Sequence, residues 1–433
     1  MKQKNKKSSA YFIGIGGIGV SALAQYYLSQ GWKVSGSDAT RSEITDELKK
    51  KDVKIFIGQR ATNVGAADLV IYSAAIKPDN AEFSQARTKG YPLLSYAQAV
   101  GELTKKYFTI AVAGSHGKST TTALIGLILV EAGWDPTIII GTKLKELGNT
   151  NFRLGQSQYL VLEADEYARS FYNYFPKIAV VTNIDKEHLD IYKNLVGVLA
   201  GFKKFFGNIS ADGYIVANRE DKNIKKILDP KPQILKPKII WYSKGKHKLL
   251  IPGIHNQFNA EAAWQAVKLL GVKRVAADKV FRNYHGAWRR LELLTTNYKL
   301  PTIIYSDYAH HPTEIKATLQ ALKEKYPKKK IICVFQPHQQ DRLNRLFKEF
   351  LTAFNLADKT VLYPLYKVKG RDSEGKSSAD LAKAINKSNI VYAENFKKIL
   401  FLLKSDLDTN SVIVFMSAGD LDSKVRKYFS TAA

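Results

Sequence analysis

Short apolar runs alternate with longer segments of helical apolar spacing along almost the whole chain. Near the N-terminus, residues 11–13, 33–38, 69–73 and 93–94 have the composition of strands, and residues 20–29 space their apolar side chains as an amphipathic helix does. Small or polar residues follow these runs, which is typical of strand ends in a parallel sheet. The pattern predicts a small parallel α/β domain in this part of the chain.

The alternation recurs in two further stretches. Strand patterns occupy residues 108–113, 159–162, 178–183, 302–307, 330–335, 360–363 and 412–415, and helical patterns occupy 120–131, 260–270 and 341–351. Residues 221–248 are rich in lysine and proline, which predicts an irregular or hairpin segment. We predict an α/β fold of three domains: Rossmann-like over residues 1–106, a central phosphate-loop ATPase sheet over 107–292, and Rossmann-like again over 293–433.

Length and cysteine usage narrow the class of protein. At 433 residues the chain suits two or three domains, and no apolar run approaches the ~20 residues that span a bilayer. The single cysteine, Cys333, lies in an apolar run, which excludes a disulfide within the chain and a cysteine zinc site. A buried thiol fits a reducing compartment. We expect a cytoplasmic monomer or homodimer without membrane insertion.

The positive charge of the chain attracts anions of any kind, but its scattered lysines also look like biased surface usage, so it identifies no partner. The net charge is +27, from 66 Lys and Arg against 39 Asp and Glu, and lysines concentrate in residues 222–248 and 323–330. A basic phosphate-loop ATPase that depends on nucleic acid is therefore one hypothesis. No array of aromatic and basic residues and no helix-turn-helix pattern accompanies the charge, so we expect no nucleic-acid partner.

Two glycine-rich turns carry the candidate chemistry. The first, at residues 14–19, lies between a strand and a helix, and Asp38 ends the next strand about twenty residues further on. This pattern is typical of a dinucleotide site, as in a nicotinamide-dependent dehydrogenase. The same turn geometry holds any diphosphate, so both interpretations stay open at this point.

The second turn, residues 114–119, reads Gly-Ser-His-Gly-Lys-Ser between a strand and a helix. Ile110 and Ala111 stand where phosphate loops usually carry an earlier glycine. The backbone N–H groups of such a turn converge on an anion at the positive end of the helix dipole. Lys118 can bridge the last two phosphates of a nucleotide, and the Ser119 hydroxyl can reach the Mg²⁺ between them.

Polar side chains follow the next strands of the predicted central domain. Glu163 begins an acidic cluster at the end of one strand, and His188 follows the next strand. Beside Ser119 they form a plausible shell for Mg²⁺, although His188 suits a solvated loop equally well. Asn256 and Asn259, three residues apart at the start of a helix, either address one planar ligand or cap the helix.

Three segments, residues 14–24, 114–122 and 307–314, together resemble the Mur ligase family. Residues 163–171, 182–190, 255–259, 289–290 and 335–338 extend the likeness in family order over nearly the whole chain. The resemblance implies an N-terminal UDP-sugar domain, a central ATPase and a closing C-terminal domain. It implies ATP-dependent ligation of L-alanine to the lactyl carboxylate of UDP-N-acetylmuramate through an acyl phosphate, in peptidoglycan precursor synthesis. A recycling ligase that joins a preformed peptide to the same sugar nucleotide is the alternative within the family.

The resemblance also implies the cofactors, ATP and Mg²⁺, and a role for each matching residue. The residues implied for the UDP-sugar are Gly14, Gly16, Gly17, Gly19, Asp38 and Ser73. Those implied for ATP are Gly114, Ser115, His116, Gly117, Lys118, Ser119, Thr120, His255, Asn256, Asn259, Arg290 and Asp307. Catalysis is implied for Lys118, Glu163, His188 and Arg290, metal binding for Ser119, Glu163 and His188, and the amino-acid pocket for Tyr308, His310, His338 and Arg342.

Some positions depart from the family pattern. Gln339 stands where an arginine often follows the Phe-Gln-Pro-His segment, and Ala168 stands where an aspartate is common. Ser115 and Ser119 replace threonines conservatively. One of two expected anchors for the amino-acid carboxylate is therefore absent, so glycine and L-serine stay open as acceptors beside L-alanine.

Overall fold

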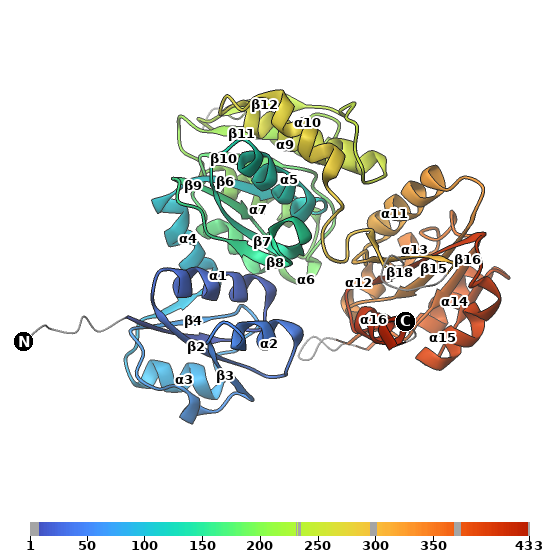
Figure 1. Ribbon diagram of the computed structural model, residues 1–433, viewed down its shortest axis with the longest axis horizontal. Coiled ribbons are helices and arrows are strands. Elements are labelled where there is room, and N and C mark those ends of the chain that lie inside the picture. The colour runs from blue at the N-terminus through green and yellow to red at the C-terminus, as the bar shows by residue number, and fades with distance from the viewer. Residues whose placement is uncertain (1–7, 231, 233–234, 295–300, 368–373, 432–433) are drawn as a thin grey trace, which may run out of the picture. The chain divides into compact units, whose positions relative to one another are not determined.

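Figure 1 shows the computed structural model, which describes residues 8–230, 232, 235–294, 301–367 and 374–431. The strands form three mainly parallel sheets, which confirms the predicted three-domain α/β fold class. By compactness the chain divides into two units, one of Met1–His247 with Phe258–Phe281 and one of Lys248–Gln257 with Arg282–Ala433. The first unit holds the first two sheets and the second holds the third. The domain boundaries near residues 106 and 292 stay predictions.

The first sheet has five parallel strands in the order β3-β2-β1-β4-β5. The strands are β1 Ser9–Ile13, β2 Lys33–Asp38, β3 Lys54–Ile57, β4 Leu69–Tyr72 and β5 Leu93–Ser95. The helices are α1 Ile18–Ser29, α2 Glu43–Lys49, α3 Ala81–Thr88 and α4 Tyr96–Lys106, with a 3₁₀ turn at Ala61–Asn63. The strand order reverses between β1 and β4, and ligands of open α/β sheets bind at such switch points. The glycine loop after β1 and Ser73 after β4 both lie there.

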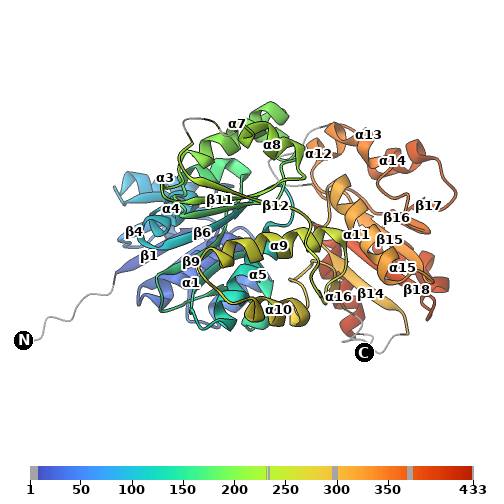
Figure 2. The same cartoon turned by 90° about the horizontal axis from the view of Figure 1, so that it is seen from above.

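The second sheet has seven strands in the order β12-β11-β10-β6-β9-β7-β8, and only β8 runs antiparallel to its neighbour. The strands are β6 Phe108–Ala113, β7 Thr137–Leu144, β8 Thr150–Arg153, β9 Tyr159–Glu163, β10 Ile178–Val181, β11 Tyr214–Asn218 and β12 Lys238–Tyr242. The helices are α5 Lys118–Glu131, α6 Leu189–Tyr192, α7 Leu195–Phe206, α8 Lys222–Leu228, α9 Ile254–Lys268 and α10 Arg274–Asn283, with 3₁₀ segments at Lys145–Leu147 and Tyr167–Asn173. Figure 2 shows α5, α9 and α10 on one side of the sheet and α7 and α8 on the other.

The prediction for residues 221–248 was wrong. This stretch contains helix α8 and then strand β12, which pairs in parallel with β11 and therefore forms no hairpin. The many lysines in this stretch make the apolar pattern of β12 hard to recognise in the sequence. In the structure, Tyr242 of β12 is buried, and its hydroxyl donates a hydrogen bond to Val181 O at 3.3 Å. The helix predicted over residues 341–351 is also interrupted, because Leu346 adopts φ −106° and ψ 17° between two short helices.

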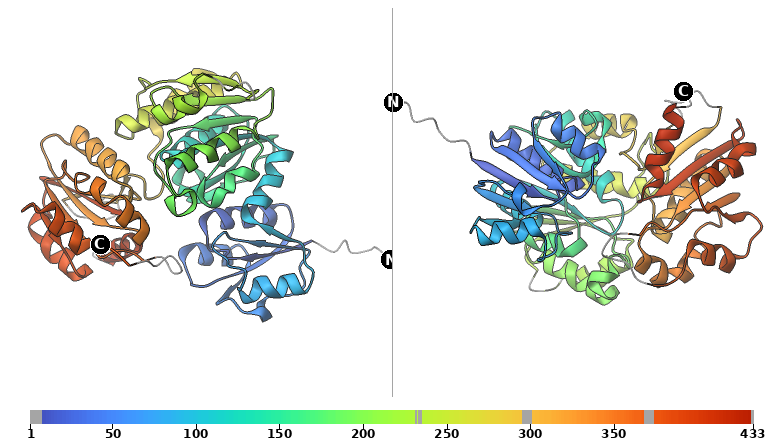
Figure 3. Two further views of the ribbon diagram at one scale, coloured as in Figure 1. Left: turned by 180° about the vertical axis from the view of Figure 1, so that it is seen from behind. Right: turned by 90° about the horizontal axis from the view of Figure 1, so that it is seen from below.

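The third sheet has six strands in the order β13-β14-β18-β15-β16-β17, with β13 antiparallel. The strands are β13 Glu292–Leu293, β14 Ile303–Asp307, β15 Lys330–Gln336, β16 Lys359–Leu362, β17 Ile390–Tyr392 and β18 Ser411–Ser417. The helices are α11 Pro312–Lys325, α12 Gln340–Arg345, α13 Phe347–Phe350, α14 Ser378–Ile385, α15 Phe396–Leu403 and α16 Leu421–Thr431, with a 3₁₀ turn at Lys404–Asp406. Apolar side chains of α11 to α14 form one core of this sheet, and those of α15 and α16 form another. Figure 3 shows helices on both faces of the sheet.

One hydrophobic core joins the first two sheets. It includes Phe12 and Leu23 from the first sheet layer and Phe171 and Phe202 from the second. Polar contacts reinforce it, since the Lys143 ammonium on β7 lies 2.7 Å from a carboxylate oxygen of both Glu43 and Glu47 on α2. The first unit is therefore one packed body that carries both glycine-rich turns. Among the described residues, no helix combines the length and apolar character that crossing a membrane requires.

Candidate functional site

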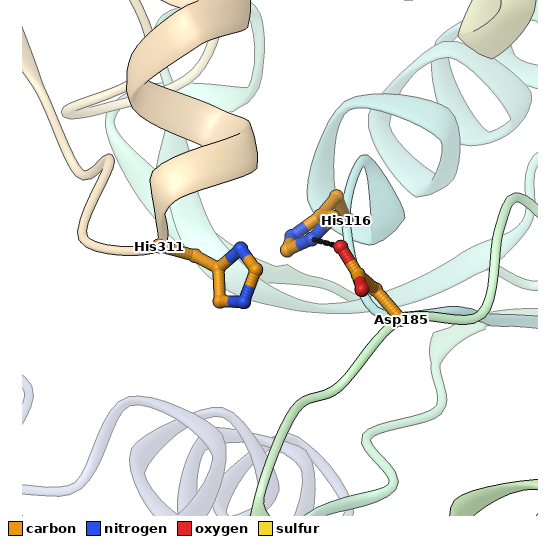
Figure 4. Close-up of side chains that lie close together, drawn as sticks. All are labelled: His116, Asp185 and His311. Carbon is orange, nitrogen blue, oxygen red and sulfur yellow. Dashed lines mark hydrogen bonds and ion pairs between the residues drawn. The ribbon is translucent and has the colours of Figure 1, made fainter. Parts of the chain in front are cut away.

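The second glycine-rich turn has the geometry of a phosphate loop. It leaves β6 at the centre of the second sheet and enters α5 at Lys118. Its amide groups donate hydrogen bonds to Asn183, which follows the neighbouring strand β10: Ser115 N donates to Asn183 O at 3.0 Å, and His116 N donates to Asn183 Oδ1 at 2.9 Å. His116 Nε2 also lies 3.4 Å from Asp185 Oδ2 (Figure 4). The loop shape is thus fixed by protein contacts before any nucleotide binds.

Glycine is required at two positions of this loop. Gly114 has φ +135° and Gly117 has φ +82°, both in the region that side chains rarely adopt. A Cβ on Gly114 would lie 2.1 Å from Thr182 Oγ1, and one on Gly117 would lie 2.3 Å from Asn259 Oδ1. Asn259 therefore packs directly on the loop, which is consistent with its implied place near the nucleotide.

Replacing Gly117 with alanine tests this packing. We expect the affinity for ATP to fall by more than about tenfold, because the new methyl group must displace Asn259 or the loop. Gly133→Ala is the matched control, since Gly133 has φ +78° but open space within 4 Å of its Cβ position. Both variants carry similar backbone strain, so isothermal titration with ATP should separate them. Equal affinities for ATP would contradict the assignment.

Hydrogen bonds and ion pairs hold the Lys118 ammonium at the phosphate loop. Its ammonium donates to Gly114 O at 2.7 Å and to Glu166 Oε2 at 2.9 Å, and it lies 3.8 Å from Asp165 Oδ1. Burial disfavours the charged form, but the carboxylates of Glu166, Asp165 and Glu163 outweigh it and raise the pKa of Lys118. Lys118 therefore carries a positive charge at the phosphate loop near pH 7.

The acidic strand end of β9 offers oxygen ligands for a cation. Glu163 accepts a hydrogen bond from Ser119 Oγ at 3.0 Å and one from Gly141 N at 2.8 Å. The structure thus brings together two of the three residues implied for Mg²⁺. The His188 ring lies instead nearest to Asp165 and Glu166, with its Nε2 3.9 Å and 3.8 Å from their carboxylate oxygens.

The residues present fit a divalent cation. Asp165, Glu166 and His188 offer ligand atoms that all lie within 4.8 Å of one another. Glu166 Oε1 is buried and makes no hydrogen bond with any residue that the structure describes. Burial raises the pKa of Glu166, while the Lys118 charge opposes that rise. A buried carboxylate oxygen without a donor, beside further hard oxygen atoms, suits Mg²⁺.

The carboxylate of Asp38, at the end of β2, holds the first glycine-rich turn by accepting backbone hydrogen bonds. Gly16 N donates to Asp38 Oδ2 at 2.9 Å, and Thr40 N donates to Asp38 Oδ1 at 3.3 Å. A Cβ on Gly14 would lie 3.0 Å from Ser73 Cβ, so the ends of β1 and β4 meet closely. Asp38 shapes the loop in this structure, and its implied contact with the UDP-sugar stays a prediction. Gly17 and Gly19 complete the turn at the start of α1.

In the second unit, residues implied for ATP come from two elements: His255 and Asn256 from the start of α9, and Asp307 from the end of β14. His255 is buried, and burial, aided by the charge of Arg290, lowers the pKa of His255 to about 4. The ring is therefore neutral near pH 7. Asn256 Nδ2 donates to Pro252 O at 2.6 Å. Asp307 ends β14 and accepts hydrogen bonds from Leu291 N at 2.6 Å and Ala309 N at 2.8 Å.

The protonation of Asp307 gives a pH prediction. Burial raises its pKa to about 6, with Arg290 opposing. The folded chain therefore holds this proton more tightly than the unfolded chain, in which the pKa of the aspartate is about 4. The contribution of the proton to the free energy of unfolding declines as pH rises between about 4 and about 6. We expect the unfolding free energy of the wild type minus that of Asp307→Asn to decrease from about pH 4 to about pH 7. Denaturant titrations at each pH measure this difference in unfolding free energy. An increase of the difference with pH would contradict the raised pKa of Asp307.

The residues implied for the amino acid form one cluster. The Tyr308 and His310 rings lie 5.3 Å apart, and the His310 and His338 rings lie 6.1 Å apart. Arg342 Nη1 donates to His338 O at 3.1 Å, which places the arginine beside the same turn. Arg290 lies over the Tyr308 ring at 5.1 Å. His311, also drawn in Figure 4, caps α11 by accepting a hydrogen bond from Thr313 N at 3.2 Å.

Besides Asp165, the sequence prediction did not assign a role to two further residues that the structure adds to these sites. Glu166 pairs with Lys118, and its position three residues after Glu163 at a strand end was a usable signal. Tyr366 stacks on His338 with ring centroids 5.5 Å apart and planes 6° apart. No sequence pattern connects Tyr366 to His338, because the contact depends on how the chain returns after β16.

These features define a nucleotide-binding α/β protein with a phosphate loop at the switch point of one sheet and a second glycine loop at that of another. Comparison with known families adds the class. The chain matches "Mur ligase family, catalytic domain" over residues 9–108, "Mur ligase middle domain" over 112–269 and "Mur ligase, glutamate ligase domain" over 289–419. The chain belongs to the Mur ligase family.

The names of individual relatives are more specific than the name of the family. The chain is 38% identical to the UDP-N-acetylmuramate--L-alanine ligase of Aquifex aeolicus, with 95% of each chain covered. It is 36% identical to the ligase of the same name from Sulfurihydrogenibium sp., with 99% of each covered. Among solved structures, UDP-N-acetylmuramate-alanine ligase from Thermotoga maritima aligns with a TM-score of 0.81 at 27% identity, covering 97% of this chain and 98% of that one.

Proposed function

We propose that the chain is an ATP-dependent ligase that joins L-alanine to the lactyl carboxylate of UDP-N-acetylmuramate in peptidoglycan precursor synthesis. The observation that carries this proposal is the full-length similarity, at 36% to 38% identity, to curated ligases named for that reaction. The two glycine-rich turns in one packed body support it independently. A sugar nucleotide and a triphosphate each need such an anion site.

The chemistry follows from the poor reactivity of a carboxylate toward an amine. A lactyl carboxylate oxygen attacks the γ-phosphorus of ATP, the bond to the β-phosphate oxygen breaks, and ADP leaves. The amino group of L-alanine then attacks the carbonyl carbon of the acyl phosphate. Inorganic phosphate leaves with one carboxylate oxygen, and the amine loses a proton as the amide forms. Transfer of this kind depends on in-line positioning and charge stabilisation.

The residues of this chain can supply both needs. Lys118, fixed beside the loop amides, stabilises the charge that spreads over the transferred phosphoryl group. Arg290 is our second candidate for that role. Ser119, Glu163 and His188, joined by Asp165 and Glu166, would hold Mg²⁺, which neutralises phosphate charge when bound. His255, Asn256 and Asn259 would meet adenine and Asp307 the ribose, with Tyr308, His310, His338 and Arg342 around the amino acid.

We propose a cytoplasmic location for the protein, because the proposed reaction needs ATP. L-alanine is the proposed acceptor because the relatives are named for it. Gln339 leaves glycine and L-serine to be compared directly. Gln339 is the N-cap residue of α12 and has φ +69°, a backbone conformation that residues other than glycine rarely adopt.

Phosphate release tests the function. We expect release from ATP only when UDP-N-acetylmuramate and an amino acid are both present, with L-alanine preferred over glycine and L-serine. The product should have the mass of UDP-N-acetylmuramoyl-alanine. Release that is indifferent to either substrate would contradict the proposal. Preference for a preformed tripeptide over L-alanine would identify the recycling reaction instead.

A further inference from the structure

A tyrosine between the first two sheets, Tyr96, has no part in the sites described above. It is the first residue of α4, and Ser95 caps that helix through reciprocal hydrogen bonds with Gln98. Helix α4 leads directly into β6 and the phosphate loop. Its middle packs tightly on the 3₁₀ segment after β9, because a Cβ on Gly101 would lie 2.4 Å from Asn173 O. The backbone that carries Tyr96 is therefore fixed relative to both sheets.

The Tyr96 ring covers the last glycine of the first loop. A Cβ on Gly19 would lie 2.7 Å from the phenolic Oη and 2.8 Å from Cζ. Gly19 belongs to the first turn of α1, whose N-terminal amide groups are the anion-binding end of the loop. Glycine at this position thus makes room for the phenol, and the hydroxyl lies beside the loop that would hold the diphosphate.

The same phenol is influenced by the acidic strand end of the second sheet. Burial and then the charges of Glu163 and Asp165 raise the pKa of Tyr96, so its hydroxyl keeps its proton at any working pH. Among the described residues, this hydroxyl makes no hydrogen bond. It is therefore a neutral donor that lies beside Gly19 and feels the charges of Glu163 and Asp165.

We propose that Tyr96 is a substrate-binding residue that donates a hydrogen bond to the lactyl carboxylate of the bound sugar nucleotide. This inference rests on the proposed function. If the diphosphate lies on residues 14–19 and the carboxylate must reach the γ-phosphate near Lys118, the muramyl group between them passes Tyr96. A neutral O–H orients an attacking carboxylate without the strong charge pairing that would reduce its nucleophilicity. The acceptor oxygen is the one that does not attack phosphorus.

Replacing Tyr96 with phenylalanine removes only the hydroxyl and keeps the ring against Gly19. By calorimetry we expect the affinity for UDP-N-acetylmuramate to fall about tenfold, the size of one hydrogen bond to a charged group. The affinities for UDP and for ATP should stay within about twofold, and kcat should fall because the carboxylate is less well oriented. Tyr107→Phe is the matched control, because it removes a hydroxyl just beyond the other end of α4, where it lies 3.4 Å from that of Tyr26.

Two results would overturn the inference. Unchanged affinity of Tyr96→Phe for UDP-N-acetylmuramate would show that the hydroxyl contacts nothing on the ligand. Equal weakening of UDP and UDP-N-acetylmuramate would place the donor on the diphosphate. Thermal melting of both variants checks that each is folded. Failure of the wild type to release phosphate with both substrates would instead count against the proposed function, so the two failures are distinguishable.

Discussion

Replacing Lys118 with alanine is expected to reduce kcat for ligation by about a thousandfold, because the variant loses the ammonium group that is held against the phosphate loop. The Lys118 ammonium contacts both Gly114 O and Glu166. Stabilising charge on a transferring phosphoryl group is usually the largest contribution to such a reaction. Initial rates of phosphate release with saturating substrates measure the effect.

A suitable control for Lys118→Ala lies on the same unit. Lys105 is exposed and pairs only weakly with Glu102 on the surface of α4, 2.7 Å away. Lys105→Ala should ligate at the wild-type rate. Because Lys118→Ala leaves the buried Glu166 without its partner, circular dichroism must first show that the variant is folded. A folded Lys118→Ala enzyme with more than about a tenth of the wild-type rate would contradict the assignment.

Replacing Glu163 with glutamine is expected to lower the affinity for Mg²⁺ and the rate at limiting Mg²⁺ by about a hundredfold. The substitution keeps the shape of the side chain but removes the charge that faces Ser119 Oγ at 3.0 Å. Proteins bind Mg²⁺ mainly through one or two carboxylates. Even the loss of a residue that only orients a metal ligand typically costs about 10–100-fold, so loss of a charged ligand should cost at least as much. Rates measured across a Mg²⁺ titration should show the curve shifted to higher concentration.

Glu102→Gln provides the corresponding control, since the Glu102 side chain is exposed. Its Mg²⁺ dependence should match that of the wild type. If Glu163→Gln also retained the wild-type dependence, the cation would have to bind elsewhere. In that case Asp165, Glu166 and His188 alone would be the better candidates, because their ligand atoms are already grouped.

The sequence predicted the elements that carry strong local signals. Strands β1, β6 and β14 are apolar runs that end in glycine or aspartate, and the structure places each beside a candidate site. The phosphate loop could be recognised because each of its key residues meets a local requirement. Gly114 and Gly117 adopt positive φ, and Lys118 contacts the loop backbone. Parallel sheets also make strand ends converge, so Glu163 and Ser119 could be expected to meet.

What could not be predicted depends on contacts between distant segments. The pairing of Lys118 with Glu166 and the position of His188 beside Asp165 depend on the turns after β9 and β10, where Ala168 and His188 adopt positive φ. Strand β12 was missed because its lysine-rich surroundings hide a half-buried edge strand. Tyr96 gave no signal at all, since its role depends on Gly19 lying beneath it.

The proposed reaction requires that a carboxylate held at one anion site is activated by the triphosphate held at the other. Ligation with UDP-N-acetylmuramate carrying ¹⁸O in both oxygens of the lactyl carboxylate tests it most directly. Mass spectrometry should find one ¹⁸O in each released phosphate and the other retained in the amide. Phosphate without ¹⁸O, formed at the same rate as the amide, would contradict an acyl phosphate and with it the proposed cooperation of the two loops.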